Sequence, residues 1–363
     1  MKCKTAEIYS HLPLIMHIIR GADSPIYSHV LLHAKGEYLK ISATNGHVTY
    51  SAVISCAVEE EGTICINGEK LCAILNDHKE EVTISGDRDK SVVAFKKSKY
   101  TLSGMPWENF PKETEKPHVP PVIISTSDLK DLIRDSFCHD KVGDIPSALS
   151  CIQMTANNGL CTAISTNKLL FSCISKPCGG QMSITIPANV IPAITKFLVG
   201  DSVEIVADAR TVFLMQGTTK IEFKQIALAY PNVSTVFIGE NARHSFKVNH
   251  GDLGLAISRI LASADQKSGD VAMEKRGDTI QLSAKNALAD GVEVVDIREA
   301  TPDDFRIHVN GFVLLEFITH LDRTILVRLD ELEKKIELGD GSAIYMTTPR
   351  IQHTVTVAKN GNN

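Results

Sequence analysis

The residues of this chain that could do covalent or metal chemistry are its nine cysteines and thirteen histidines. Both kinds are dispersed, and the closest spaced cysteines that resemble a motif are Cys173 and Cys178 in CISKPC, so no C-x-x-C occurs. Zinc and redox sites use shorter, repeated spacings. An odd number of scattered cysteines in a long chain indicates reduced, mostly buried thiols, as in a cytosolic protein. A metal or redox role is the alternative.

The common signatures of enzyme active sites are absent from the sequence. GDGSA is not a nucleophile elbow, and neither G-x-x-x-x-G-K-[ST] nor H-E-x-x-H occurs. We therefore expect no catalytic residues, no cofactor and no metal. An enzyme with a Cys/His site on this scaffold would have to show an activity that is lost when one such residue is replaced.

Composition and length indicate a globular protein with a sizeable core. The chain has 363 residues, 43% of them hydrophobic and 22% charged, which suggests two or three domains. The net charge of -5 excludes little, because a local patch matters more than the sum. No apolar run approaches the about 18 residues that span a bilayer. His11, His17 and Arg20 interrupt the N-terminal apolar stretch, so we expect no signal peptide, no membrane contact and a cytoplasmic location.

An internal repeat organises the chain. Strand-turn-helix patterns recur in TICINGEKLCAIL, MSITIPANVIPAIT and FRIHVNGFVLLEFI, and their strand ends are spaced by 120 and 123 residues, at Ile66, Ile186 and Val309. A second set of equivalent positions is spaced by 122 and 119 residues, at Asn45, Asn167 and Asn286. A third is the terminal strand of each copy, in YTLSGMPWENFP, IEFKQIALAYPN and AIYMTTPRI. The sequence therefore predicts three copies of one domain.

Each copy has the pattern of an α+β domain with two helices on one side of an antiparallel sheet. The spacing predicts one helix over residues 6–21, with Ile8, Leu12, Ile15 and Ile19 on its apolar face. Further first helices are predicted in STSDLKDLIRDSF, capped by Ser127, and in HGDLGLAISRILASADQ. The second helices start at the turns INGEK, IPANV and VNGFV, and the intervening strands alternate with period two.

Proline-rich and polar segments separate the copies. PKETEKPHVPP, from Pro111 to Pro121, is predicted as the first linker, and IGENARHS near Gly239 as the second. We expect domains at residues 1–118, 119–242 and 243–351, followed by a C-terminal extension at 352–363. Because Pro cannot donate to a sheet ladder, the strand before GMPWENFP should end at a sheet edge.

Three motifs in register with the repeat resemble the bacterial DNA polymerase III beta subunit, the sliding clamp, over about residues 1–351. LSGMPWENFP is similar to the family's L-S-x-L-P-x-x-x-F-P, AYPNVSTVFI to F-P-D-Y-x-x-V-x-P, and YMTTPRI to M-P-M-R-L. The resemblance implies a ring-shaped homodimer of two three-domain protomers, closed head to tail, with sheets outside and helices around duplex DNA. It implies a processivity factor that tethers polymerase and other replication and repair proteins. A phage- or plasmid-type decoy or regulator that keeps only the fold is the alternative.

The resemblance implies sequence-blind DNA contacts by basic side chains on the inner helices. For each candidate, a plain solvated cation is an equal alternative. The candidates are Arg20, Lys70, Lys130, Arg134, Lys141, Lys196 and Arg259. The family's aromatic pair after the first helix of domain 2 is absent, because this chain has KVGDIPS there.

The resemblance also implies a cleft between domains 2 and 3 that binds short linear motifs of the Gln-Leu-x-Leu-Phe type in polymerase and clamp-loader subunits. The positions that match it are Ser165, Asn167, Lys168, Leu170, Pro231, Thr235, Val236, Asn310, Val313, Thr347, Pro349, Arg350 and Ile351. An ordinary core role is the alternative for Leu170, Val236 and Ile351. The family's D-G-H-R turn is replaced by Thr166–Leu169, and Met-Pro-Met by Thr347–Pro349, so we expect a shallower, more polar floor.

For the ring junction, domain 1 of one protomer should meet domain 3 of the other. The positions implied on domain 1 are Lys70, Lys97, Lys99, Tyr100 and Leu102. Those implied on domain 3 are Ile260, Leu261, Asp290 and Glu293. The charges on the two sides are opposite, although pairs at a rim are individually weak.

Overall fold

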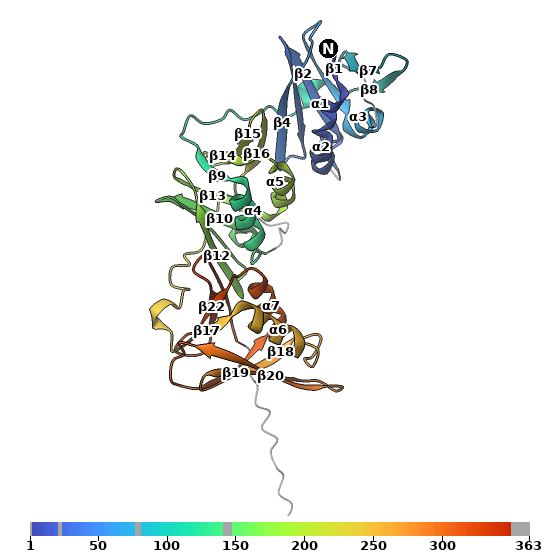
Figure 1. Ribbon diagram of the computed structural model, residues 1–363. Helices are drawn as coiled ribbons and strands as arrows, with labels where there is room; N and C mark the ends of the chain where they lie inside the picture. Colours follow the sequence, from blue (N-terminus) through green and yellow to red (C-terminus); the bar gives the residue numbers. More distant parts are fainter. Residues whose placement is uncertain (1, 21–23, 77–80, 141–146, 350–363) are drawn as a thin grey trace, which may run out of the picture. The chain divides into compact units, whose positions relative to one another are not determined.

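A computed structural model describes residues 2–20, 24–76, 81–140 and 147–349 (Figure 1). Arg350, Ile351, Lys141 and the predicted extension at 352–363 lie outside the described residues. None of the described helices is long and apolar enough to cross a membrane.

The order strand, helix, four strands, helix, three strands repeats three times along the chain, which confirms the predicted α+β repeat. The elements of the first copy are β1 (Lys2–Lys4), α1 (Thr5–Tyr9), α2 (Leu12–Ile19), β2 (His29–Lys35), β3 (Tyr38–Thr44), β4 (Val48–Ser55), β5 (Gly62–Asn67), α3 (Gly68–Leu75), β6 (Glu81–Gly86), β7 (Lys90–Ala94) and β8 (Lys99–Ser103). Those of the second are β9 (Val122–Ser125), α4 (Thr126–Asp135), β10 (Cys151–Asn157), β11 (Leu160–Thr166), β12 (Leu170–Pro177), β13 (Met182–Pro187), α5 (Ile191–Phe197), β14 (Ser202–Ala207), β15 (Thr211–Gln216) and β16 (Thr219–Lys224). Those of the third are β17 (His244–Asn249), α6 (His250–Ile260), β18 (Asp270–Arg276), β19 (Thr279–Lys285), β20 (Asp290–Arg298), β21 (Phe305–Asn310), α7 (Gly311–Thr319), β22 (Thr324–Leu329), β23 (Ile336–Gly339) and β24 (Ala343–Thr347).

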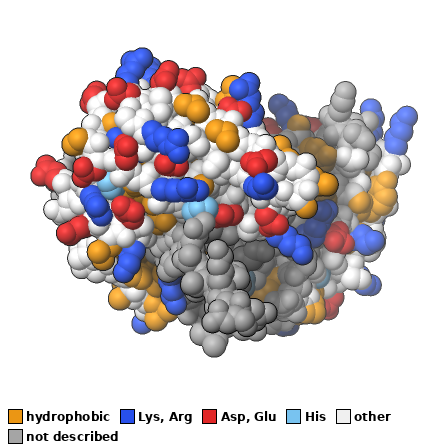
Figure 2. Space-filling model, turned by 90° about the horizontal axis from the view of Figure 1, so that it is seen from below, with side chains coloured by type: hydrophobic (Ala, Val, Ile, Leu, Met, Phe, Trp, Pro, Cys, Tyr) orange, Lys and Arg blue, Asp and Glu red, His pale blue; other side chains and the backbone are white. Residues whose placement is uncertain are grey.

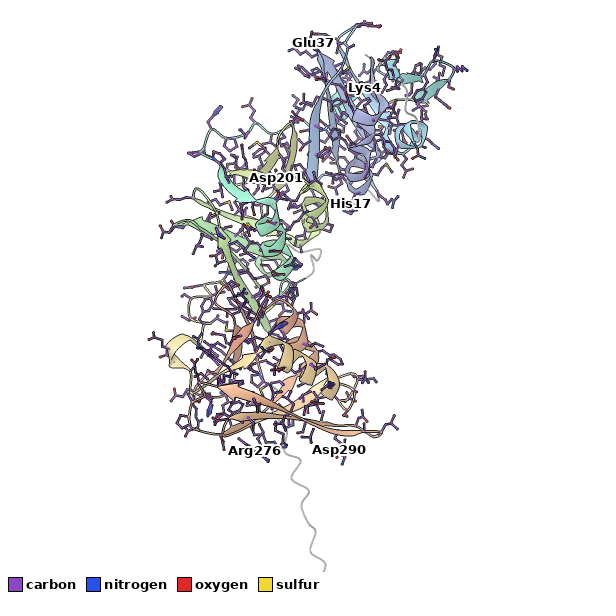
Figure 3. All side chains as sticks on the ribbon, viewed as in Figure 1. Lys4, His17, Glu37, Asp201, Arg276 and Asp290 are labelled. Atoms are coloured by element: carbon purple, nitrogen blue, oxygen red, sulfur yellow. The ribbon has the colours of Figure 1, made fainter. Side chains whose placement is uncertain are left out.

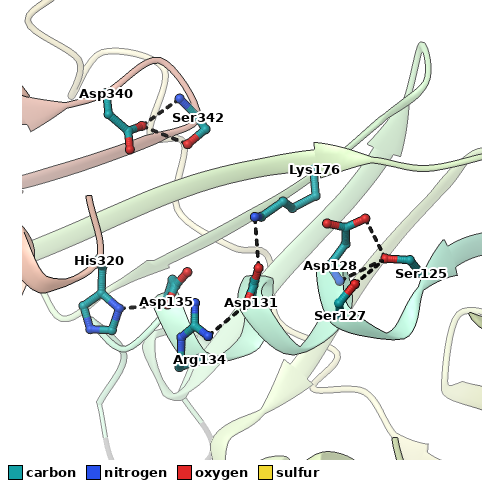
Figure 4. A network of polar contacts seen from close by, with 10 residues as sticks. All are labelled: Ser125, Ser127, Asp128, Asp131, Arg134, Asp135, Lys176, His320, Asp340 and Ser342. Atoms are coloured by element: carbon teal, nitrogen blue, oxygen red, sulfur yellow. Dashed lines mark hydrogen bonds and ion pairs between the residues drawn. The ribbon is translucent and has the colours of Figure 1, made fainter. Parts of the chain in front are cut away.

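Two predictions about helix starts were wrong in detail. The predicted helix over residues 6–21 is two helices, α1 and α2, and Pro13 stands in the first turn of α2. Proline has no N–H to donate and its fixed φ suits a helix start, so it favours a new helix over continuation. The cap of α4 is Ser125 and not Ser127, because the Ser125 hydroxyl accepts from the Asp128 N–H at 3.0 Å and donates to its carboxylate at 2.6 Å (Figure 4).

The described chain divides into two compact units that are not contiguous in sequence. The first comprises residues 1–134, 141–162 and 176–229, and the second comprises residues 135–140, 163–175 and 230–363. The predicted domain boundaries stay a prediction.

The first unit contains a four-stranded sheet in the order β1-β6-β7-β8 and an eight-stranded sheet in the order β5-β2-β3-β4-β16-β15-β14-β9. Strand β4 of the first copy pairs antiparallel with β16 of the second, with Tyr50 opposite Ile221. This joint removes an open edge from each copy. Strand β8 ends its sheet, which confirms the predicted edge.

The second unit contains the run of paired strands β12-β24-β23-β22-β17-β20-β19-β18-β21. Helices α6 and α7 pack on each other, and α6 also packs on β17, β19 and β20. The apolar face of α6 is buried at Leu253, Ile257 and Ile260, as the spacing predicts. These contacts hold the polar face of α6 at the surface.

The predicted first linker is anchored by a half-buried carboxylate. Glu113 pairs with Lys40 of β3 and lies 3.7 Å from Lys220 of β16, while the Ser42 hydroxyl donates to it at 3.2 Å. Burial alone would raise the pKa of Glu113, but the Lys40 hydrogen bond and the two lysine charges lower it overall. The linker therefore ties together strands of two copies.

Candidate functional site

The turn between β11 and β12 is fixed by its own side chains. The Asn167 side-chain oxygen accepts from the N–H groups of Leu169 at 3.1 Å and Leu170 at 2.8 Å. The Thr166 hydroxyl donates to the Leu170 carbonyl at 2.7 Å, and Lys168 adopts a left-handed φ of 78°. Lys168 and Leu169 are exposed, whereas Leu170 is half-buried. The turn is thus a rigid rim for a candidate binding surface.

Strand pairing brings Leu170 opposite Thr347 of β24, and Ser172 opposite Tyr345. Because side chains alternate along a strand, these four share one face of the sheet. Ser165 is fully buried: its hydroxyl accepts from the Cys138 N–H at 3.0 Å and lies 2.7 Å from the Ser172 hydroxyl. Thr347 is 9% exposed. Leu170 is therefore the more accessible apolar group of this set.

An aromatic stack that the sequence analysis did not single out lies on the same face. Phe137, Phe317 and His320 surround Tyr345, whose ring centroid lies 5.6 Å from that of Phe137 and 5.1 Å from that of Phe317. Tyr345 is 0% exposed, and its hydroxyl donates to the Asp135 carbonyl at 3.1 Å. A tyrosine in the strand YMTT was the only sequence signal for this stack. The stack thus packs the chain's own side chains on the sheet face that carries Leu170 and Thr347, and the depth of a pocket floor there stays a prediction.

The segment after β16 packs against β12 and β23. Phe237 meets Phe171 edge to face at 5.3 Å, and the Ile238 N–H donates to the buried Glu337 at 3.0 Å. The Lys335 ammonium donates to the Val236 carbonyl at 3.4 Å. These contacts leave Pro231 and Thr235 exposed and Val236 half-buried.

Asn310 and Val313 start α7. The Asn310 side chain accepts from the Phe312 N–H at 3.0 Å and the Val313 N–H at 3.3 Å, so it caps the helix, and it lies opposite Asp270 of β18. Val313 and Pro349 are half-buried. The place of these residues in a common pocket with Leu170 stays a prediction.

The candidate DNA-facing cations are exposed wherever they are described. Arg20, Lys70, Lys130 and Lys196 lie on α2, α3, α4 and α5 or directly after them. Arg134 donates to Asp131 at 2.8 Å, and Asp131 also accepts from Lys176 at 3.1 Å (Figure 4). Arg259 lies 4.0 Å from Glu293. Acidic and basic side chains are intermixed on the face in Figure 2, so acidic charge is not segregated there.

The candidate junction residues on β8 stand on an open edge. Lys97, Lys99 and Tyr100 are exposed, Tyr100 by 40%, and Leu102 is half-buried. The Tyr100 ring packs edge-on to Phe95 at 6.4 Å. An exposed edge strand with an aromatic side chain and lysines can accept a further strand.

On the second unit, Ile260 and Leu261 are only 2% and 7% exposed, so they belong to the core below the surface and offer almost no area for direct contact with a partner. Asp290 is exposed and pairs with Lys285 at 3.0 Å. Val292 and Val294 of the same strand are 58% and 59% exposed, and the sequence analysis missed them although DGVEVVD alternates with period two. Strand β20 pairs with β19 from Asp290 to Asp296 but with β17 only at Ile297 and Arg298. Among the described residues, the first part of β20 therefore has an open edge.

Cys72, Cys173 and Cys178 are half-buried free thiols, and the buried free thiols are Cys56, Cys65, Cys138, Cys151 and Cys161. Burial raises the pKa of Cys161 to about 12 and that of Cys173 to about 11, so both resist ionisation. Within the described ranges, no group of three or more His, Cys, Asp or Glu side chains could hold a metal ion.

Comparisons with known proteins find similarity to one family, described as DNA polymerase III beta subunit or beta sliding clamp. Residues 1–114 match the family model described as DNA polymerase III beta subunit, N-terminal domain. The beta sliding clamp of Treponema pallidum (strain Nichols) is 24% identical over 288 residues, which cover 75% of this chain and 77% of that protein. The beta sliding clamp of Buchnera aphidicola subsp. Acyrthosiphon pisum (strain APS) is 21% identical over 350 residues, covering 91% and 93%.

Solved structures share the fold. The DNA polymerase III subunit beta of Pseudomonas aeruginosa superposes with a TM-score of 0.87 at 19% identity, covering 97% of this chain and 100% of that one. The DNA polymerase sliding clamp of Bacillus subtilis gives a TM-score of 0.87 at 14% identity, covering 97% and 99%. At these identities the superpositions establish the fold alone.

Proposed function

Because this chain is a divergent member of the DNA polymerase III beta subunit family, we propose that it is a DNA polymerase processivity factor, a sliding clamp that encloses duplex DNA. The observation that carries the proposal is the threefold order of elements, which extends the family match at residues 1–114 through the rest of the chain. The clamp performs no reaction. It works by topology, because a closed ring cannot leave DNA sideways.

The helices supply the DNA-facing surface of the ring. Arg20, Lys70, Lys130 and Lys196 are exposed on four helices of the first unit, and Arg259 on α6 of the second. Lysine and arginine contacts to phosphates are sequence-independent and exchange easily, which sliding requires. The charge of Arg134 is partly neutralised by Asp131, so Arg134 should contribute less to phosphate binding than Arg20, Lys70, Lys130 and Lys196 do.

Two protomers close the ring by pairing β8 of one with the open part of β20 of the other. This is a heterologous contact, and such a contact makes a closed ring when its rotation closes. Tyr100 and Leu102 would meet Val292 and Val294, above the buried Ile260 and Leu261. Lys97 and Lys99 would face Asp290 and Glu293 across the rim.

Partners bind at the surface built by the turn at 166–170, β24 and the segment after Pro231. Polymerase and clamp-loader subunits would dock short Gln-Leu-x-Leu-Phe-like motifs there, with Leu170 and Val236 as apolar contacts. The Tyr345 stack fills the space below, so binding is weaker than in a deep cleft.

The decoy alternative rests only on the altered turn and C-terminal motif, and no relative named above is described as a decoy. The clamp is therefore favoured. A cytoplasmic location follows from the same proposal, since the clamp must reach the DNA that the polymerase copies.

The test is retention on circular DNA. A clamp loader from the same source should load the protein onto nicked circular duplex, and cutting the circle should release it because the ring slides off the ends. Retention that survives cutting, or failure to load while a known clamp loads in parallel, would reject the topological mechanism and favour the decoy.

A further inference from the structure

One histidine on α2 stands on the exposed side of a helix whose opposite side is core. Leu12, Ile15, Ile18 and Ile19 are buried. Pro13, His17 and Arg20 follow at spacings of four and three residues, so they share the outward face. His17 is half-buried and Arg20 is exposed. Figure 3 labels His17 at the end of α2 that carries Arg20.

Helix α5, which belongs to the second copy of the repeat, packs beside α2 in the first unit (Figure 1). An aromatic contact between the sheet and α5 stabilises this packing, because the ring of Tyr50 on β4 meets that of Phe197 on α5 edge to face, with the centroids 6.4 Å apart. The Tyr50 hydroxyl also lies 2.6 Å from His11 Nδ1, at the start of α2. Lys196 precedes the buried Phe197 and is exposed. The joint between the two copies thus places the helix that carries Lys196 beside α2.

The charges around His17 are all of one sign among the described residues that act on it. Burial lowers the pKa of His17 first, and the positive charges of Lys196 and Arg20 lower it further. The other charged groups on the elements packed against α2 are Glu7 on α1, Lys40 on β3, and Glu69 and Lys70 on α3, and none of them shifts this pKa. Asp23 lies outside the described residues. Neither Arg20 nor Lys196 has an ion-pair partner within the described chain. A half-buried imidazole that feels two positive charges, neither of them ion-paired within the described chain, is suited to an anion.

We propose that His17, Arg20 and Lys196 bind one backbone phosphate of duplex DNA, and that His17 takes up a proton from solvent when the phosphate binds. The proposal rests on the clamp function and adds a proton-linked contact to it. The phosphate charge offsets the repulsion from the two cations, so the bound state favours the imidazolium. Protonated His17 can then donate to a phosphate oxygen, as a charge-assisted hydrogen bond.

Linkage fixes the direction of the pH effect. Affinity for DNA falls as pH rises between the pKa of His17 in the free protein, below 6.5, and its higher value in the complex. The steepest change is about tenfold per pH unit for each proton taken up. The dependence of DNA affinity on salt should also be steeper at low pH, where His17 is protonated. Each added phosphate contact steepens the slope of log affinity against log salt concentration by about 0.9.

The experiment measures binding of the full-length protein to a short linear duplex, across a salt series, at about pH 6 and about pH 8. The wild type should bind more tightly and with a steeper slope at the lower pH. His17→Gln should have the shallower slope at both pH values, and His17→Lys the steeper slope at both. His33→Gln is the matched control, since His33 lies on β2 and its Nδ1 is 2.7 Å from the Thr63 hydroxyl. It should behave as the wild type does.

The imidazole of His17 can be followed by NMR during a pH titration as a second readout. Duplex DNA should raise its pKa, and inorganic phosphate at the same phosphate concentration should raise it much less, because the duplex presents many phosphates. An equal rise with inorganic phosphate would reduce the cluster to a general anion site and overturn the DNA assignment.

A His17→Gln protein with unchanged pH dependence would also overturn the proposal. If the wild type is retained on circular DNA but shows no pH dependence, this inference fails alone. If it is not retained on circles, the clamp function itself fails.

Discussion

At the scale of single residues, His320 contacts two carboxylates. Its Nδ1 lies 2.8 Å from Asp135 (Figure 4), its Nε2 lies 3.4 Å from Glu316, and its ring packs on that of Phe137 with the centroids 4.8 Å apart. The hydrogen bond to Asp135 raises the pKa of His320 most strongly, burial opposes this, and the charges of both carboxylates add to the rise. His320 therefore fastens the segment 135–140 to α7 and β24 within the second unit.

We expect this fastening to weaken as pH rises. A folded pKa above the ordinary 6.5 means that the stabilisation is complete below 6.5 and is lost as pH rises through the folded value. Amide hydrogen exchange of α7 and residues 135–140 should thus accelerate over that window beyond the intrinsic effect of pH. His320→Gln should exchange faster at low pH and lose the extra dependence.

The matched control is His33→Gln on β2, which should leave exchange in the second unit unchanged. If His320→Gln keeps the wild-type dependence, the pair with Asp135 does not stabilise the segment.

At the scale of elements, the turn between β11 and β12 is the most exposed rigid part of the proposed partner surface. Its backbone is fixed by Thr166 and Asn167, so a change at Leu170 should alter the surface without altering the turn. The half-buried Leu170 lies opposite Thr347, above the Tyr345 stack. A carboxylate at this position would have to be desolvated under a bound peptide.

We predict that Leu170→Asp weakens binding of a Gln-Leu-x-Leu-Phe-type peptide by about tenfold or more, which corresponds to about 1.4 kcal/mol. Fluorescence anisotropy with a labelled peptide measures it, and light scattering should give the same mass as for the wild type. Leu160→Asp introduces the same charge at the end of β11 that is far from the turn, at a side chain that is 50% exposed, and should have little effect. Equal binding by the Leu170→Asp protein would show that the pocket lies elsewhere.

At the scale of the whole molecule, two open strand edges stand on different units of the chain. One is β8, and the other is the part of β20 that β17 does not cover. The valines at 292 and 294 expose more than half of their side-chain surface, which is unusual in a strand that needs no partner. Pairing of the two edges between protomers would cover both at once.

Light scattering at micromolar concentration should therefore give twice the chain mass of 39.6 kDa. Replacing both Val292 and Val294 with Asp should shift the equilibrium toward the monomer, because charge would replace apolar contact at the junction. Leu332→Asp, at a side chain that is 67% exposed between β22 and β23, is the control and should remain dimeric. A wild-type protein that stays monomeric would refute ring closure by two protomers.

The sequence by itself determined the repeat, the α+β class, the apolar face of α6 and the edge position of β8. Each of these depends on short-range rules: side-chain periodicity, the missing N–H of proline, and residue spacing between equivalent turns. The motifs at Leu102–Pro111, Ala229–Ile238 and Tyr345–Ile351 also sufficed to indicate the family. The break between α1 and α2 was missed because a proline in a first turn leaves the apolar spacing nearly intact.

Only the tertiary structure decided which side chains of the matched motifs are accessible. Ser165, Ile260 and Leu261 were candidates for binding surfaces, but each is buried by elements distant in sequence. Val292 and Val294 are exposed because β17 pairs with only the far end of β20. The charge of Lys196 acts on His17 because β4 of one copy pairs with β16 of the next and α2 then packs beside α5. Periodicity along one segment predicts which face is apolar, but what covers that face depends on a partner whose position the local sequence does not encode.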